Sequence, residues 1–174
     1  MLRSLGLLLL DQGRYAEARG RFEQAGAIFE AIGDRVFEAN VLGNLALLLL
    51  VEGQLETSRE RFERALALNR ASGNRHSEGF VLRNLGSVWG KLGESDKALA
   101  CFEEALAIAR SLGNRISEGV ALGSLGEHLA RHGEDQEARE ALEQCLTICR
   151  ESGVVGVALT VGCVLGLVLA RQGE

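Results

Sequence analysis

Two histidines, His128 and His132, stand four residues apart and would lie on one face of a helix. That spacing suits two zinc ligands, and Glu127 stands beside them. In the His-Glu-x-x-His motif of zinc hydrolases, however, the acid lies between the ligands and acts as general base. Here the acid precedes both histidines, and the sequence offers no evident third ligand. We therefore predict two surface histidines near a helix end, with no metal and no other cofactor.

The cysteines and glycines do not form a catalytic pattern either. Cys145 and Cys149 are also four apart, but Cys145 falls in a column of small residues, which predicts a buried, unreactive thiol. Four cysteines are too few for the disulfide framework of a small secreted protein. The glycines fit helix ends or close packing rather than a phosphate-binding loop, and no nucleophile is paired with a base. We predict that the chain is not an enzyme.

The composition fits one soluble domain or a short run of repeats. The chain has 174 residues, 47% of them hydrophobic and 25% charged, with 22 glycines and no proline. Aromatic residues make up only 5%, so the core must be mainly aliphatic. A net charge of −5 argues against nucleic acid as a partner, because neutralising phosphates requires clustered lysines and arginines.

The strongest signal is an internal repeat with a spacing of 40 residues. Two columns of glycine follow this spacing, one of them Gly13, Gly53, Gly93, Gly133 and Gly173, the other Gly33, Gly73, Gly113 and Gly153. A third column holds large residues, namely Phe22, Phe62, Phe102 and Leu142. A fourth column is always small, with Ala25, Ala65, Ala105 and Cys145. These four columns predict that the protein is built from structural repeats of 40 residues.

Each period contains two helices. Residues 75–93 place their apolar side chains at the i, i+3, i+4, i+7 spacing of one helical face, and Gly93 would end that helix in the left-handed conformation. Residues 94–113 form a second amphipathic helix that ends at Gly113. Each hairpin has apolar faces that only its neighbours can cover, which is why such units occur in series.

One unit carries a motif made of Leu82, Leu85, Gly86, Trp89, Gly93, Ala98, Phe102 and Ala105. It resembles the tetratricopeptide repeat, in which Trp-x-x-Leu-Gly-x-x-Tyr is followed by Gly, Ala, Phe and Ala at these offsets. The unit is longer than the usual length of about 34 residues. The proline that commonly ends the second helix is replaced by Arg70, Arg110 or Arg150. The longer unit resembles the arrays of kinesin light chain, the Leu-Gly-Asn polarity adaptors and many bacterial regulators.

The resemblance implies an all-α fold, a right-handed solenoid of antiparallel helix hairpins with about nine helices. A single domain would cover residues 1–174, divided into a partial unit 1–33, full units 34–73, 74–113 and 114–153, and a partial unit 154–174. The last helix has no polar outer face, so we favour a fragment of a longer array over a face covered by another chain.

In such arrays the first helices of the hairpins line a concave groove. By offset from the small residue of each first helix, we assign to this groove Asn44, Leu47, Leu50, Val51, Arg83, Asn84, Ser87, Lys91, Glu127 and Arg131. The resemblance implies that an asparagine there binds the backbone of an extended peptide; the alternative is a bond to a neighbouring helix. The groove is expected to begin apolar, starting at Leu7 and Leu10, and to become basic and polar near Arg83. The carboxylate clamp of chaperone-binding domains is incomplete, so that function is not carried over.

These features predict a non-enzymatic scaffold that binds a peptide or helix of a partner protein, acidic or amphipathic in character. The alternatives are a sensor or autoinhibitory region of a larger bacterial regulator, and an oligomerisation element. The N-terminal apolar run is too short for an export signal, so we expect a cytoplasmic protein. The uncharged run 154–170 aligns with the repeats, which argues against a membrane span. We expect it to mediate self-association through Val157, Val161, Val164 and Val168.

Overall fold

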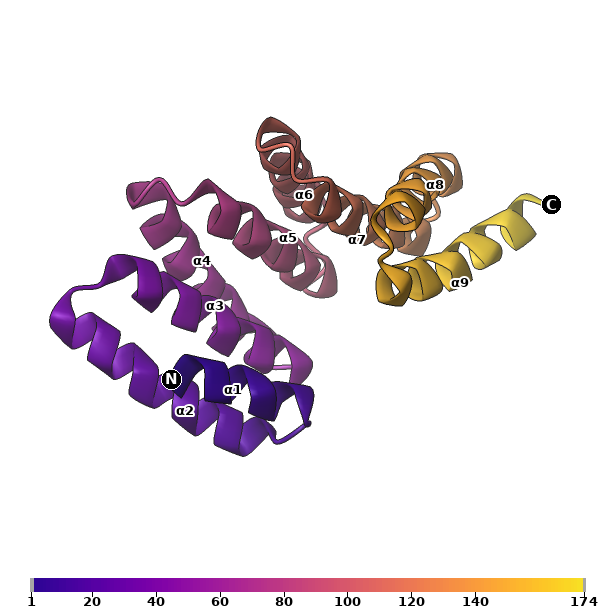
Figure 1. Ribbon diagram of the computed structural model, residues 1–174. Helices are drawn as coiled ribbons and strands as arrows, with labels where there is room; N and C mark the ends of the chain where they lie inside the picture. Colours follow the sequence, from indigo (N-terminus) through magenta and orange to yellow (C-terminus); the bar gives the residue numbers. More distant parts are fainter. Residues whose placement is uncertain (1, 174) are drawn as a thin grey trace.

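The computed structural model describes residues 2–173, which form helices joined by short turns (Figure 1). In this part of the chain there are nine helices and no strands: α1 (Leu2–Asp11), α2 (Tyr15–Ile32), α3 (Arg35–Val51), α4 (Leu55–Ala71), α5 (Arg75–Lys91), α6 (Ser95–Ser111), α7 (Arg115–His132), α8 (Asp135–Ser152) and α9 (Val155–Gln172). Consecutive helices pair into four hairpins, and α9 packs against the last of them. The right-handed α-solenoid predicted from the sequence is confirmed.

The turns lie where the two glycine columns predict them. Every glycine of these columns has a positive φ, from 62° at Gly113 to 84° at Gly173. Such a backbone favours glycine and closes a helix end. Three first helices begin with a side-chain cap, since the carboxylate or amide oxygens of Asp34, Asn74 and Asn114 accept from the backbone three residues later. Glycine and cap together fix the connections into α3, α5 and α7, whereas the other connections have the glycine without a side-chain cap.

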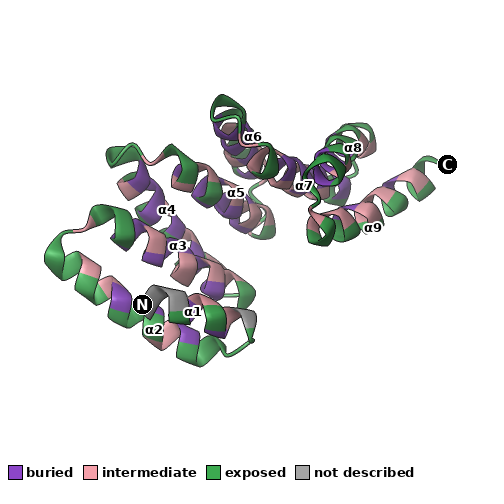
Figure 2. Cartoon of the chain, viewed as in Figure 1, coloured by how far each residue is buried: buried purple, intermediate pink, exposed green. Residues whose placement is uncertain are grey.

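The core runs along the inside of the array, where the two helices of each hairpin meet (Figure 2). The column of large residues is fully buried, as predicted: Phe22, Phe62, Phe102 and Leu142. These side chains lie directly against small residues of the first helix. A Cβ atom added at Gly86 would fall 2.8 Å from the Phe102 ring, and one at Gly126 would fall 2.7 Å from Leu142. The absence of a side chain at Gly86 and Gly126 therefore allows the two helices of each of these hairpins to approach closely.

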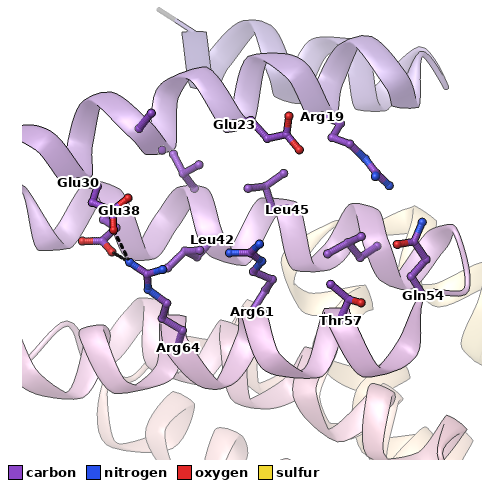
Figure 3. Close-up of a pocket in the computed structure, with 14 residues that line it drawn as sticks. Arg19, Glu23, Glu30, Glu38, Leu42, Leu45, Gln54, Thr57, Arg61 and Arg64 are labelled. Carbon is purple, nitrogen blue, oxygen red and sulfur yellow. Dashed lines mark hydrogen bonds and ion pairs between the residues drawn. The ribbon is translucent and has the colours of Figure 1, made fainter.

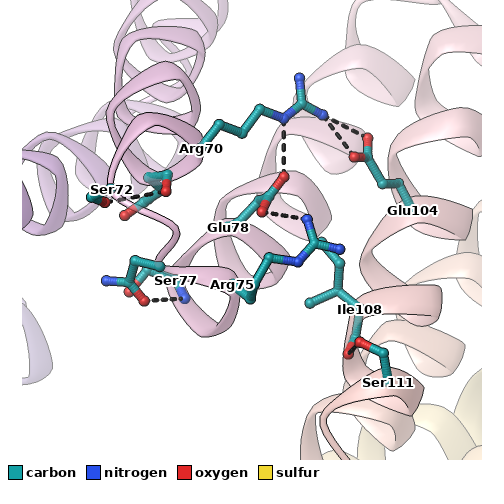
Figure 4. Close-up of polar contacts among 10 residues, drawn as sticks. Arg70, Ser72, Arg75, Ser77, Glu78, Glu104, Ile108 and Ser111 are labelled. Atoms are coloured by element: carbon teal, nitrogen blue, oxygen red, sulfur yellow. Dashed lines mark hydrogen bonds and ion pairs between the residues drawn. The ribbon is translucent and has the colours of Figure 1, made fainter.

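Ion pairs that the sequence analysis did not predict join successive hairpins (Figure 4). Glu78, near the start of α5, is only 2% exposed. Its carboxylate accepts hydrogen bonds from Arg75 at 2.7 Å and from Arg70, in the preceding helix, at 3.0 Å. Arg70 also binds Glu104 of the following second helix at 2.7 Å. Arg70 thus links three consecutive helices, α4, α5 and α6.

The same arrangement recurs one unit later, where Glu118 accepts from Arg115 at 2.7 Å and from Arg110 at 3.0 Å. Arg70 and Arg110 are two of the arginines that replace the proline of the family pattern, so the replacement supplies the cation of these two junctions. Burial raises the pKa of Glu118, but the hydrogen bonds from Arg110 and Arg115 outweigh this effect and hold the pKa below its ordinary value. We call this series of first-helix glutamates and their arginine partners the ladder. It stops at α9, where the position equivalent to Glu118 is Ala158.

Helix α9 corrects one prediction. The four valines expected to mediate self-association turn toward α7 and α8: Val161 and Val168 are buried, and Val157 and Val164 pack against the same core. They follow the register of the earlier first helices, whose corresponding residues also face inward. Self-association through this helix stays a prediction, but these valines cannot form its contact surface.

The outer face of α9 is exposed and apolar. Val155, Leu159 and Leu167 are each at least 66% exposed. Within residues 2–173, α9 is the one helix with the length and mean hydropathy, 1.8, of a membrane-spanning segment. A Cβ atom added at Gly166 would meet nothing within 4 Å, whereas the equivalent Gly86 and Gly126 each lie against a second helix. The part of this face around Leu159 and Gly166 is therefore the part that a second helix covers in the earlier units.

Candidate functional site

Two neighbouring cavities lie between the N-terminal halves of the first helices. The first, here the polar cavity, has a volume of about 170 Å³ and lies between α3 and α5; it is lined by Ala39, Asn40, Gly43, Asn44, Asn69, His76, Ser77, Phe80 and Val81. The second, here the apolar cavity, measures about 150 Å³ and lies between α5 and α7 over α6; its lining includes Phe80, Arg83, Ala105, Ile108, Ala109, Ile116 and Val120. They occupy equivalent places one unit apart, and Phe80 lines both.

The polar cavity contains buried amides without partners. Asn69, in α4, has a relative exposure of 0%, and neither its amide nitrogen nor its oxygen has a hydrogen-bond partner in the protein. The amide nitrogen of Asn44 is likewise buried and unpaired. Across the cavity, the Ser77 hydroxyl donates to the Asn40 amide oxygen at 3.3 Å. Because an unpaired buried polar group is destabilising, the set indicates a place for a molecule that both donates and accepts hydrogen bonds.

The apolar cavity has a cation at its edge. The guanidinium carbon of Arg83 lies 5.5 Å from the centroid of the Phe80 ring, a cation–π arrangement. Among the described side chains, no carboxylate lies within 4 Å of Arg83. Burial lowers the pKa of Arg83, while the charge of Glu127 acts in the opposite direction. An arginine remains charged under such conditions, so the cavity combines an apolar lining with an unneutralised cation.

Of the ten predicted groove residues, Asn44 and Arg83 line one of these two cavities, and the other eight do not. Asn84 is 4% exposed, and its amide nitrogen donates to the Phe80 carbonyl of its own helix at 2.9 Å. The amide donor of Asn84 is thus already used within α5. The observed bond is neither to a partner peptide nor to a neighbouring helix, the two possibilities that the sequence left open.

The other predicted groove residues stay outside the cavities. Ser87 donates its hydroxyl to the Arg83 carbonyl at 3.3 Å. Arg131 donates to the Glu127 carbonyl at 3.2 Å, and both these residues lie in α7. Lys91 is exposed.

The predicted apolar start of the groove belongs mainly to the core. Leu47 and Leu50 are half-buried and pack against the central core cluster, as Leu7 and Leu10 do against the first. Val51 alone in this set is exposed. The offset counting placed these leucines on the right helices but did not account for how deeply neighbouring hairpins cover them.

Sequence reasoning missed Asn69 and Phe80, although the repeat contains a signal for both. Asn69 replaces a residue that is Ala109 and Cys149 in the next two units, so it introduces an amide into an otherwise apolar column. Phe80 stands where the neighbouring units have Asn40 and Val120. A search for polar residues in apolar columns would have identified Asn69, and a search for an aromatic residue in a column that otherwise lacks one would have identified Phe80.

The histidine prediction was wrong for His128. This side chain is 1% exposed, because it occupies a column that is otherwise Leu48, Val88 and Val168. One ring nitrogen lies 2.9 Å from the Ser95 hydroxyl, and the other has no partner in the protein. Burial lowers the pKa of His128, and the charges of His132 and Arg131 lower it further.

Within residues 2–173, no three His, Cys, Asp or Glu side chains converge as a metal site would require. Cys145 is fully buried with its sulfur 3.9 Å from that of Cys149. Burial raises the pKa of Cys145, which keeps the thiol protonated. The predicted burial of Cys145 is confirmed, and its lack of reactivity stays a prediction.

The sequence matches the family model described as Tetratricopeptide repeat in three overlapping segments, residues 1–71, 37–111 and 77–151. Among curated proteins, none has a sequence that matches significantly.

Several solved structures share the fold. The chain is 20% identical to BtubC (BKLC) from P. vanneervenii, with a TM-score of 0.81 over 99% of this chain and 72% of that one. It is 20% identical to a putative kinesin light chain from Podosopora anserina, with a TM-score of 0.77 over 99% and 85%. A Rap protein complexed with Competence and Sporulation Factor is 18% identical, with a TM-score of 0.89 over 99% of this chain and 48% of that one.

Proposed function

Because this chain belongs to the tetratricopeptide repeat family, whose arrays serve as scaffolds for protein–protein interaction, we propose that it binds an extended peptide of a partner protein across the two cavities, without catalysing a reaction. The observation that carries the proposal is the buried, unpaired amide of Asn69 in the polar cavity, next to an apolar cavity edged by Arg83. The Rap protein of similar fold, solved with Competence and Sporulation Factor, supports it as an analogy.

The chemistry of the two cavities suggests how the peptide is held. A peptide group or a carboxamide both donates and accepts hydrogen bonds, so it would satisfy both unpaired atoms of Asn69, with Asn44 as a further donor. An apolar side chain of the same peptide would enter the neighbouring cavity beside Phe80. A carboxylate would then neutralise Arg83. This agrees with the expectation of an acidic or amphipathic partner.

A random peptide library displayed on phage tests the proposal. Peptides selected on the chain should be enriched in an apolar residue near an acidic one, and Arg83→Gln should weaken their binding about tenfold, the usual effect of losing a charged hydrogen bond. Asn69→Ala, which restores the residue type of Ala109, should also weaken binding. It should leave the thermal midpoint unchanged or higher, since it removes an unpaired buried amide.

Glu103→Lys and Glu143→Lys serve as controls, because both side chains are exposed on second helices outside the cavities. Neither should alter peptide binding. If these changes abolish binding while Asn69→Ala and Arg83→Gln have no effect, the binding surface lies on the second helices and the proposed groove is wrong.

A further inference from the structure

A third pocket lies between two second helices, apart from the proposed groove (Figure 3). It has a volume of about 330 Å³ and is enclosed by α2 and α4, with α3 as its floor. The floor is aliphatic, with Val41, Leu42, Leu45 and Leu49, while charged residues of α2 and α4 form its sides. None of its lining residues belongs to the polar or the apolar cavity. Its volume lies at the lower end of the range of about 300–1,000 Å³ typical of ligand pockets.

Beside this pocket, one column of the repeat lacks its usual side chain. Position 26 is glycine, whereas the equivalent residues of the later units are Leu66, Leu106 and Leu146. Leu66 is 9% exposed and belongs to the core cluster that contains Val81 and Leu82, in the first helix that follows it.

Gly26 faces Val41 in α3, the residue equivalent to Val81 in α5. A Cβ atom added at Gly26 would lie 3.4 Å from a methyl carbon of Val41, in ordinary contact, so a side chain at this position would extend over the floor of the pocket. The part of the pocket beside Gly26 is therefore space that a leucine side chain at this position would occupy.

Two side chains of opposite charge face this space without an ion-pair partner among the described residues. Figure 3 shows Glu23 and Arg61 directed toward the pocket from α2 and α4 respectively. The neighbouring Arg64 is already engaged, since it binds Glu38 at 2.6 Å and Glu30 at 3.0 Å. Glu23 and Arg61 thus remain available for charges brought in by another molecule.

We propose that this pocket receives a leucine-sized aliphatic side chain of a partner polypeptide, in the place of the one that Gly26 omits. An acidic residue beside that side chain would face Arg61, and a basic residue would face Glu23. The register of the repeat identifies the aliphatic occupant, and charge complementarity identifies its flanking residues. The site is independent of the proposed groove and would give the array a second contact on its other side.

Two blocked tripeptides, acetyl-Glu-Leu-Lys-amide and acetyl-Glu-Ala-Lys-amide, test the proposal by NMR titration of the ¹⁵N-labelled chain. The leucine peptide should shift the amide signals of residues around Gly26 and Leu42. The alanine peptide should bind at least about tenfold more weakly, because it buries less apolar surface. Absence of shifts at this pocket with the leucine peptide, or equal binding of both peptides, would overturn the proposal.

Gly26→Leu fills the pocket from within and should abolish the shifts. Gly20→Leu is the matched control, since Gly20 lies in the same helix, outside the pocket, with no neighbour within 4 Å of an added Cβ atom. Arg61→Glu gives a second test that leaves the core intact and should weaken the leucine peptide severalfold. Unchanged binding in a folded Gly26→Leu or in Arg61→Glu would also contradict the proposal. Asn69 and Arg83 lie outside this pocket, and Gly26 and Arg61 lie outside the two cavities of the groove, so each pair of variants reports on one site and either site can fail alone.

Discussion

At the scale of single residues, the informative positions are those that depart from their column. His128 is a histidine in an aliphatic column, and Asn69 is an amide where the later units have Ala109 and Cys149. Both are buried, and both keep a polar atom without a partner in the protein. Periodicity identifies the column, but it cannot tell whether the neighbours satisfy an unusual member. That depends on side chains contributed by other helices.

His128 predicts an acid-sensitive stability. Because burial, together with His132 and Arg131, lowers its pKa, the unfolded chain binds the proton more readily than the folded one. Stability is thus fully present above the unfolded pKa of about 6.5 and falls as the pH decreases from there toward the lowered pKa. In His128→Leu, which adopts the residue type of Leu48, urea unfolding should lose this dependence.

His76→Asn is the control for this experiment, since His76 is exposed in α5. This variant should keep the pH dependence of the wild type. Glu118, whose pKa is lowered, contributes stability above an unfolded pKa of about 4.3 that is lost only as the pH falls further, so the two effects separate. An unchanged slope between pH 6.5 and 5 in His128→Leu would show that other groups cause it.

At the scale of elements, the sequence was sufficient to predict each helix, its terminal glycine and the large residue at each hairpin interface. These three features depend on residues that lie within one 40-residue period of the sequence. It was not sufficient for the ladder through Glu78 and Glu118, because a buried carboxylate on a first helix is recognisable only once Arg70 and Arg110 are placed beside it. The pocket at Gly26 was missed for a related reason, since a void is the absence of a side chain.

The column of large residues gives a direct stability test. Phe102→Ala should lower the free energy of unfolding by about 3–5 kcal/mol, because the ring fills the space against Gly86 and its loss leaves a cavity. Glu103→Ala, an exposed change at the next residue of α6, should alter it by less than about 1 kcal/mol. Equal, small effects in urea denaturation would mean that the aromatic column does not support the hairpin.

At the scale of the whole molecule, each unit contacts only its neighbours, so stability is distributed along the array. The central helices α5, α6 and α7 are packed on both sides, whereas α9 has an uncovered outer face and the ladder does not reach it. Of the ten residues predicted for the groove, Asn44 and Arg83 line the two cavities of the proposed site, and the other eight do not. How far a side chain is buried in the solenoid depends on how the neighbouring units pack against each other.

Native-state hydrogen exchange should follow this distribution. Amides of α9 are expected to exchange faster than those of α7, because local opening of a terminal helix exposes less apolar surface than opening of a central one. Exchange monitored by mass spectrometry at neutral pH measures the difference. Protection of α9 equal to that of α7 would show that the array unfolds as a single cooperative unit.

The recurring junction between units has a genetic consequence. Residues 74–113 meet the preceding unit through Arg70 and Glu78 and the following one through Arg110 and Glu118, two junctions of the same chemistry. An in-frame duplication of the codons for this unit would place Arg110 before a second copy of Glu78 and so reproduce an existing junction. Unequal crossing-over within the gene can therefore change the number of units while every new boundary inherits a working ion pair.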